Sequence, residues 1–253
     1  MNNEAFVCYI KECEEKYKRF MCISEFPSYK IVEKELSEEK LNTQGFEALA
    51  TASYDFENKV HILTVWSKLN EYGNLGENII FHELTHIYDY ENYTGDDVKK
   101  HLVYHAYTEY HASQVQLMNL LGVENISHVT EFSIQDEIDT FFGHMTVKEY
   151  VELASAEAAE IINEGNFPSD ISVLSAALGR MFNYYGRRSI CEMYAVDYAD
   201  FKKDDGIERL LNDEKEQYFN DFMKGWFEDS KIKILVYMYS ELLYSLLKKY
   251  GFI

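Results

Sequence analysis

The hydrophobic pattern of this 253-residue chain changes its period at Gly73 and Gly76. Before that point, apolar residues alternate along two runs, residues 46–54 and 60–66, with a turn-like sequence at 55–59. Alternation of period two predicts strands, and the short turn predicts that they pair as an antiparallel hairpin. After Gly76, apolar residues recur at helical spacing nearly to the end. The pattern therefore predicts an α+β fold, with a small antiparallel β-sheet followed by a mostly α-helical C-terminal body.

Capping signals set the expected helix boundaries. Apolar residues at helical spacing predict an N-terminal helix over residues 3–21. Later helices should start where Ser, Thr or Asp precedes a helical pattern, because these side chains accept hydrogen bonds from first-turn amides. Such starts occur at Thr94 with Asp97, at Thr146 with Glu149, at Pro168 to Asp170, and at Asp213 with Glu216. The last helix is expected from about Ser230 to Tyr250, before Gly251.

The chain carries 44 acidic and 24 basic residues, a formal net charge of −20. Affinity for phosphate groups comes mainly from Lys and Arg, so nucleic acid and anionic membrane surfaces are not expected partners. The most apolar stretch, Ile234 to Leu247, is interrupted by Glu241 and is too short to cross a bilayer, so it predicts a buried helix. The N-terminus lacks a secretory pattern, and the four cysteines form no CxxC pair. These features predict a cytoplasmic protein with reduced thiols.

One motif carries chemistry: His82-Glu83-Leu84-Thr85-His86, or HExxH. The flanking apolar residues predict that residues 77–90 form a buried helix, on which positions i and i+4 share one face. His82 and His86 could therefore bind one metal ion, with the Glu83 carboxylate beside it. The alternative is a helix whose histidines bond only to core carbonyl groups. Two histidines and a carboxylate on a buried helix are costly to satisfy without a metal, which favours the metal site.

The HExxH helix resembles the active-site helix of the zincin metallopeptidases. The resemblance implies that His82 and His86 bind Zn²⁺ and that Glu83 is the general base for a zinc-bound water. A catalytic zinc takes three protein ligands, so a third ligand is expected. The metzincin pattern does not fit, because Asp89 and Asn92 stand where that family has glycine and histidine.

Glu109 fits the third ligand of the gluzincin type, which lies on a second helix some tens of residues downstream. Glu109-Tyr110-His111-Ala112-Ser113 resembles the gluzincin ExxAD or ExxSD signature, in which a small residue lets two helices approach. Ser113 replaces the family's aspartate, which orients a ligand histidine, and Asp89 is the alternative for that role. His105, one turn before Glu109, is the rival zinc ligand.

Under the resemblance, an extended substrate adds to an edge strand beside the metal, and a side chain donates to the reaction's oxyanion. Residues 61–66 form the strand nearest in sequence to the motif. Tyrosine or histidine usually supplies the donor, and the candidates stay unranked: Tyr104, Tyr107, His144, Tyr184 and Tyr185. The resemblance covers about residues 45–121. We expect residues 1–125 to form a zincin-like catalytic region, and residues 126–253 to pack with it as one helical unit.

The expected function is zinc-dependent limited proteolysis of a protein substrate, with Glu83 activating the zinc-bound water. Between His101 and Gly179, Lys148 is the only basic residue against twelve acids. This segment is either a solvated acidic surface or a cleft wall that selects a basic polypeptide. The alternative functions are a non-catalytic zincin scaffold that holds a metal, and an acidic inhibitor that binds protein.

Overall fold

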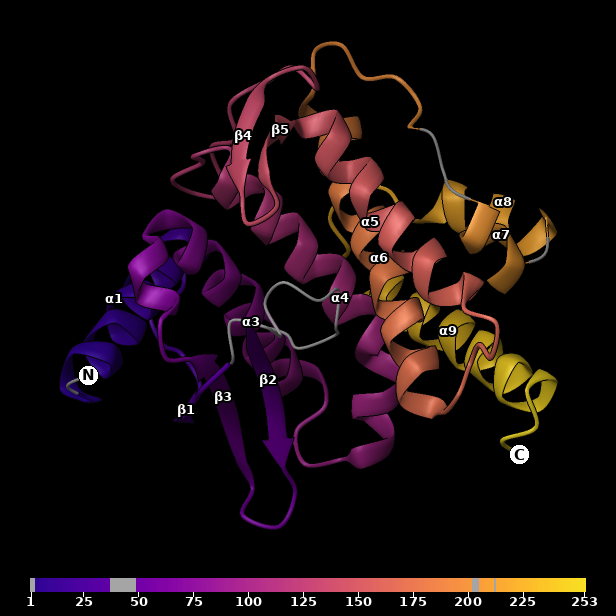
Figure 1. Cartoon of the computed structure of the whole chain (residues 1–253), viewed down its shortest axis with the longest axis horizontal. Helices are drawn as coiled ribbons and strands as arrows, with labels where there is room; N and C mark the ends of the chain where they lie inside the picture. The colour runs from indigo at the N-terminus through magenta and orange to yellow at the C-terminus, as the bar shows by residue number, and fades with distance from the viewer. Residues whose placement is uncertain (1–2, 37–48, 202–204, 212) are drawn as a thin grey trace.

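The computed structural model describes residues 3–36, 49–201, 205–211 and 213–253. Its elements confirm the predicted α+β class, with a small sheet at one side and a helical body at the other (Figure 1). In chain order they are α1 (Asn3–Met21), β1 (Tyr29–Lys34), β2 (Ala50–Asp55), β3 (Val60–Trp66), a 3₁₀ turn (Leu69–Tyr72), α3 (Asn74–Tyr93), α4 (Val98–Leu120), β4 (Glu137–Thr140), β5 (Gly143–Thr146), α5 (Val147–Asn163), α6 (Ile171–Tyr194), α7 (Asp205–Leu210), α8 (Asp213–Phe222) and α9 (Asp229–Lys249).

The first sheet contains the predicted hairpin and one strand that was not predicted. β2 and β3 pair antiparallel, with Ala50 opposite Val65, while residues 46–48 of the expected first strand lie outside the described residues. β1 adds in parallel to the other side of β3, so the described strand order is β1-β3-β2 and the sheet is mixed. The expectation that residues 61–66 form an edge strand is therefore wrong, since β3 is central and β2 is outermost on its side of the described sheet.

The helix α3 packs between the sheet and α1. The predicted apolar face of α1 is buried, and it consists of Phe6, Ile10, Cys13, Tyr17 and Phe20. Tyr17 reaches α3, where its hydroxyl donates to Thr85 Oγ1 at 3.1 Å, and its ring meets Phe81 edge to face at 5.4 Å. These contacts fix the helix that carries the HExxH motif, and they confirm the predicted helix over residues 77–90.

The helix α4 lies in the middle of the molecule (Figure 1). It packs against α3 on one side and against α6 and α9 on others. Its own residues are therefore buried on all sides from Ala106 to Met118, including Tyr110, Ala112 and Val115. A helix that is buried all round is positioned by several neighbours at once, which holds its side chains in fixed places.

Most of the predicted helix starts are confirmed. Thr146 and Glu149 form a complete capping box at the start of α5, and Asp170 caps α6 by accepting from the first-turn amides. At α4 the cap is Asp97 alone, whose Oδ1 accepts from two first-turn amides. Thr94 instead ends α3, where its backbone amide and hydroxyl both donate to Tyr90 O, so the capping box predicted for Thr94 with Asp97 does not form.

The C-terminal half is mostly helical, as predicted, apart from the β4–β5 hairpin. Within α9, the face that meets the body is buried and the opposite face is exposed. Leu235 and Tyr239 are 0% and 1% exposed, whereas Tyr237 and Tyr244 are 67% and 60% exposed. In the described part of the chain, no helix has the length and apolarity that crossing a membrane would require.

Candidate metal centre

The two motif histidines face one point from α3. One helical turn separates them, and their Nε2 atoms lie 3.1 Å apart. The surrounding contacts of α3 bury His86, which is 7% exposed as a whole residue, while the His82 side chain keeps 14% exposure. Such an approach requires either a proton shared between two rings or a cation that both lone pairs bind.

Glu109 brings a carboxylate to the same point from α4. Its Oε2 lies 3.7 Å from His82 Nε2, and its Oε1 lies 3.7 Å from His86 Nε2. Zn²⁺ bound at about 2.0–2.1 Å in tetrahedral geometry separates its ligand atoms by about 3.3 Å. The two histidine nitrogens, 3.1 Å apart, are close to that spacing. The two 3.7 Å distances end on different oxygens of Glu109, and one ligand atom from each of the three residues lies within 4.8 Å of the others, so the side chains converge as a His₂Glu donor set.

The protonation states of His86 and Glu109 suit a cation. Burial lowers the pKa of His86 to about 3, and neighbouring histidines add to this effect against the opposing charge of Glu109. Burial by itself would raise the pKa of Glu109, but His86, His82 and His105 together hold it below its usual value. At neutral pH a neutral imidazole and a carboxylate therefore face each other, as metal binding requires.

Glu83 follows His82 on α3, and its carboxylate reaches the sheet. Its Oε2 accepts from the backbone amide of Ala52 on β2 at 2.6 Å. Burial is the main reason that its pKa is raised to about 7; Glu109 adds to the effect, and His82, the Ala52 amide and Lys34 oppose it. The strand beside the motif is thus β2, and not residues 61–66 as expected. A carboxylate with such a pKa is suited to accept and return a proton near neutral pH.

His105 lies next to Glu109 but outside the group of converging ligand atoms. Its Nδ1 is 3.8 Å from Glu109 Oε1, while its Nε2 lies 3.3 Å from the carbonyl oxygen of Ser175 on α6. In the described part of the chain, the residues whose ligand atoms all lie within 4.8 Å of one another are His82, His86 and Glu109. The geometry thus brings the three expected ligands together and leaves the rival at one side.

Neither residue expected to orient a ligand histidine does so. Asp89 pairs instead with His111, whose Nδ1 lies 2.9 Å from Asp89 Oδ2, and both residues are buried. Ser113 contacts Asn183 on α6. Among the described residues, the Nδ1 atoms of His82 and His86 are buried without a hydrogen-bond partner.

The five residues proposed as oxyanion donors make their contacts elsewhere. Tyr104 and Tyr107 pack on Tyr93, with ring centroids 5.7 and 5.3 Å away. His144 is an exposed residue of β5 that pairs with Glu137 and Asp139. Tyr184 and Tyr185 pack against each other in the core, where Tyr185 also stacks on Phe219. None of these contacts joins one of the five to His82, His86 or Glu109, and a donor role for any of them stays a prediction.

Tyr239 of α9 lies near the metal cluster, although the sequence did not indicate it as a site residue. Its ring lies 6.4 Å from that of His105. Burial raises its pKa, and the charges of Tyr90 and Glu109 raise it further, so its hydroxyl remains protonated and lies within the field of the metal cluster. Tyr90, one turn after His86 on α3, stacks on that histidine with ring centroids 6.1 Å apart, a contact that helical spacing predicts. No local pattern in the sequence places α9, and with it Tyr239, beside α4.

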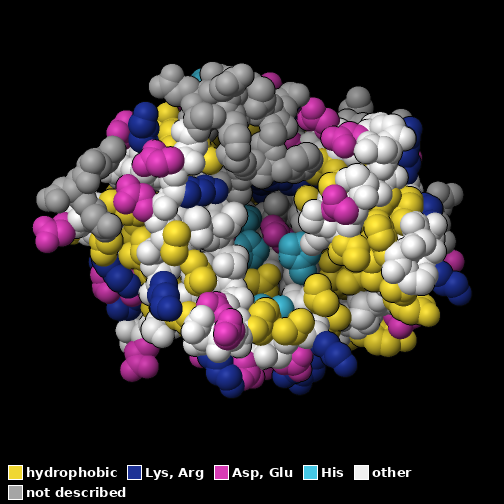
Figure 2. Space-filling model, turned by 60° about the horizontal axis from the view of Figure 1, so that its bottom comes forward, with side chains coloured by type: hydrophobic (Ala, Val, Ile, Leu, Met, Phe, Trp, Pro, Cys, Tyr) yellow, Lys and Arg dark blue, Asp and Glu magenta, His cyan; other side chains and the backbone are white. Residues whose placement is uncertain are grey.

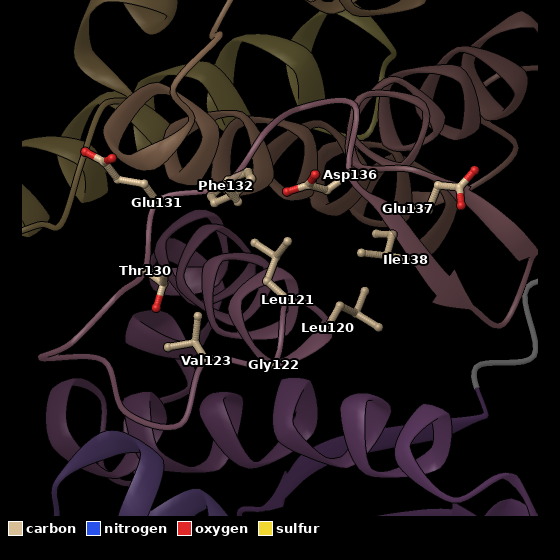
Figure 3. A pocket seen from close by; sticks show the side chains of 10 residues that line it. All are labelled: Leu120, Leu121, Gly122, Val123, Thr130, Glu131, Phe132, Asp136, Glu137 and Ile138. Carbon is tan, nitrogen blue, oxygen red and sulfur yellow. The ribbon is translucent and has the colours of Figure 1, made fainter.

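The cluster opens to solvent. Figure 2 shows a hollow on one face of the molecule with histidine and acidic side chains at its centre. The side chains of His82 and Glu109 keep 14% and 16% exposure, which is enough for a small solute to reach them. A second cavity of about 360 Å³ lies elsewhere, between the end of α4 and β4 (Figure 3). Its lining is mixed, with apolar side chains beside Glu131, Asp136 and Glu137.

Comparison with protein-family models, with curated proteins and with solved structures found no match to this chain. The assignment of a function therefore depends on the geometry of the site and on the resemblance of its motifs.

Proposed function

We propose that this protein is a zinc-dependent endopeptidase of gluzincin type that cleaves a protein substrate at limited sites. The observation that carries the proposal is the convergence of His82, His86 and Glu109, whose ligand atoms lie within 4.8 Å of one another. Glu83, the motif's carboxylate, lies beside this cluster and faces the outermost described strand of the sheet.

The roles follow from the chemistry of each side chain. His82 and His86 would hold Zn²⁺ through Nε2, and Glu109 through its carboxylate. The bound ion would supply a Lewis acid that polarises the scissile carbonyl and lowers the pKa of water. Glu83 would accept the proton of that water on its carboxylate and pass it to the leaving amine.

The strand β2 offers a backbone to which an extended peptide could add. The Ala52 amide points out of the hairpin toward Glu83 and fixes the carboxylate close to where a substrate backbone would lie. Tyr239 is a candidate donor to a developing oxyanion, because its hydroxyl is protonated and its ring lies 6.4 Å from that of His105, the neighbour of Glu109.

The substrate would be a polypeptide, with a basic protein favoured by the charge of −20. Many acids of the segment 101–179 lie on β4, at the top of Figure 1, and on α5, which runs from the top to the middle, whereas the hollow opens at the bottom. A basic substrate would thus meet these acids at a distance from the metal cluster. A cytoplasmic location and limited action belong to the same proposal, since a broadly active peptidase would endanger its host.

The test combines metal content with turnover. His82→Ala, His86→Ala and Glu109→Ala should lose stoichiometric zinc, measured by atomic emission on purified protein. Glu83→Gln should keep its zinc, because the amide preserves size and an acceptor for the Ala52 amide. Its turnover of a proteome-derived peptide library, read by mass spectrometry, should fall by about two orders of magnitude or more. His105→Ala is the matched control and should keep its zinc.

Two outcomes would overturn parts of the proposal. Loss of zinc in His105→Ala together with full zinc in Glu109→Ala would replace the third ligand but leave a zincin-like site. Zinc in the wild type with no difference in cleavage between the wild type and Glu83→Gln would remove the peptidase activity. The protein would then be a metal-holding scaffold or an acidic inhibitor that binds protein.

A further inference from the structure

The helix α6 places an amide directly against the third ligand. The side-chain amide nitrogen of Asn183 lies 2.9 Å from Glu109 Oε2, 3.0 Å from the Glu109 carbonyl oxygen and 2.5 Å from Ser113 Oγ. The nitrogen must face this way, because the amide oxygen in its place would face two oxygens of Glu109 that have no proton to donate. Asn183 is 5% exposed, so these contacts are shielded from water.

Two glycines on the same face of α6 make this approach possible. A Cβ atom at Gly179 would lie 3.4 Å from both Glu109 Cδ and His105 Nε2, so the carboxylate already packs against α6. One at Gly186 would lie 2.2 Å from the carbonyl oxygen of Tyr110, which no real Cβ could do. Gly179, Asn183 and Gly186 therefore form a narrow face of α6 that presses against α4 at the ligand.

The support is distributed unequally among the three ligands. Glu109 receives a buried hydrogen bond from Asn183, whereas the Nδ1 atoms of His82 and His86 have no partner among the described residues. Support of a metal site from outside its ligands usually acts on the histidines. Here the residue that is oriented is the carboxylate, and the orienting group comes from the C-terminal half of the chain.

We propose that Asn183 is a positioning residue that fixes the Glu109 carboxylate for metal binding, so that α6 sets the affinity of the site. The inference rests on the proposed metal site but not on peptidase activity. One hydrogen bond from the amide holds Oε2 and limits rotation of the carboxylate, which leaves Oε1 turned to His86. Without that donor, Glu109 would have to be ordered at the moment of metal binding, at a cost in affinity.

The experiment measures zinc affinity by competition with a fluorescent chelator, together with thermal unfolding of the metal-free protein. Asn183→Leu keeps the approximate size but removes both amide hydrogens, and zinc affinity should fall about 10- to 100-fold. Asn183→Ala serves as a second variant in case the leucine does not fit. Ser113→Ala keeps the contacts between Asn183 and Glu109 and removes only the contact of the amide with Ser113 Oγ. Its loss of zinc affinity should therefore be smaller.

Asn220→Ala is the matched control. Asn220 lies on α8 and its Oδ1 accepts from Arg188 of α6 at 2.9 Å, away from the metal cluster. Asn220→Ala should lower the unfolding temperature but leave zinc affinity within about twofold of the wild type. Equal zinc affinity in Asn183→Leu, Asn183→Ala and the wild type would overturn the inference, as would an equal loss in Asn220→Ala.

The same measurement separates this inference from the proposed function. A wild type that binds zinc tightly and loses affinity on Asn183→Leu, yet cleaves no peptide, supports the positioning role and contradicts the peptidase. If the wild type cleaves peptides but Asn183→Leu binds zinc as tightly as the wild type, the peptidase is supported and the positioning role is contradicted. A wild type that binds no zinc contradicts both.

Discussion

Burial shifts the pKa values of two side chains of the HExxH motif in opposite directions. Burial lowers the pKa of His86 to about 3 and raises that of Glu83 to about 7. Both shifts favour the neutral form, since a buried charge without full compensation is unfavourable. The free energy of unfolding of the metal-free protein should therefore depend on pH through both residues. Substitution of one residue isolates its contribution from that of the other.

We predict that Glu83→Gln becomes more stable relative to the wild type as pH rises from 4.5 to 7. The pKa of Glu83 is raised from 4.5 to about 7 in the folded state, so the folded wild type binds more protons than the unfolded chain in this window. Wild-type stability is lost as pH rises through it, and glutamine has no such loss. The difference should reach about 3 kcal/mol.

Urea unfolding of chelator-treated wild type and Glu83→Gln at several pH values measures this difference. The contribution of His86 is common to both proteins and cancels. Parallel stability curves across the window would mean that burial does not raise the pKa of Glu83.

Tyr239 is the second residue with a prediction of its own. Tyr239→Phe removes one hydroxyl from a buried position beside His105 and in the field of Glu109. If it donates to the oxyanion, kcat should fall by about two orders of magnitude while KM and zinc content stay near those of the wild type. Tyr184→Phe is the control, since Tyr184 is equally buried but packs on Tyr185. Equal kinetics for the two variants would exclude Tyr239 from this role.

At the scale of elements, the contact between α4 and α6 depends on a missing side chain. A Cβ at Gly186 would come within 2.2 Å of a backbone oxygen of α4, and a helix backbone cannot yield as a side chain can. The two helices would have to separate along the face that also carries Asn183. Close packing of these helices therefore links stability to the order of the metal site.

We predict that Gly186→Ala lowers the free energy of unfolding by about 3 kcal/mol or more, the upper range for overpacking. Gly165→Ala, in the turn after α5, meets no atom within 4 Å and should change stability by less than about 0.5 kcal/mol. Chemical denaturation of both variants tests the prediction. A Gly186→Ala protein as stable as Gly165→Ala would show that the helices can move apart at little cost.

How far the sequence predicts this structure depends on the range of the interactions. Local signals succeeded: the hairpin turn, the capping box of Thr146 and the face shared by His82 and His86 all depend on neighbours within a few residues. β1 was missed because Tyr29–Lys34 mixes charged residues into its pattern. Asn183 and Tyr239 were missed because their proximity to Glu109 comes from the packing of α6 and α9 on α4, which no local pattern encodes.

At the scale of the whole molecule, negative charge is concentrated in one part of the chain. The segment 101–179 has twelve acids and one basic residue, Lys148. Several acids lie on β4 and α5, and three are among the residues around the second cavity (Figure 3). Charges at the surface attract a basic partner over a distance that dissolved salt shortens.

We predict that cleavage of a basic protein weakens as salt rises, mainly through KM, once the Debye length drops to about 10 Å or less. The measurement is kcat and KM for a histone as a generic basic substrate between low and high salt. A neutral peptide cleaved at the same bond is the control and should change little. A salt-independent KM for the histone would leave the acidic segment as a solvated surface without a role in selection.

The order of the elements along the chain also decides when the site can be completed. A protein is synthesised from its N-terminus, so α3 and α4, which carry all three proposed metal ligands, leave the ribosome well before α6 and α9. A half-made chain would carry the ligands without Asn183 to hold Glu109 and without the hydroxyl of Tyr239. Under the proposed function, peptidase activity would then begin only after α9 has packed on α4. Neither the nascent chain nor neighbouring proteins would be cleaved during synthesis.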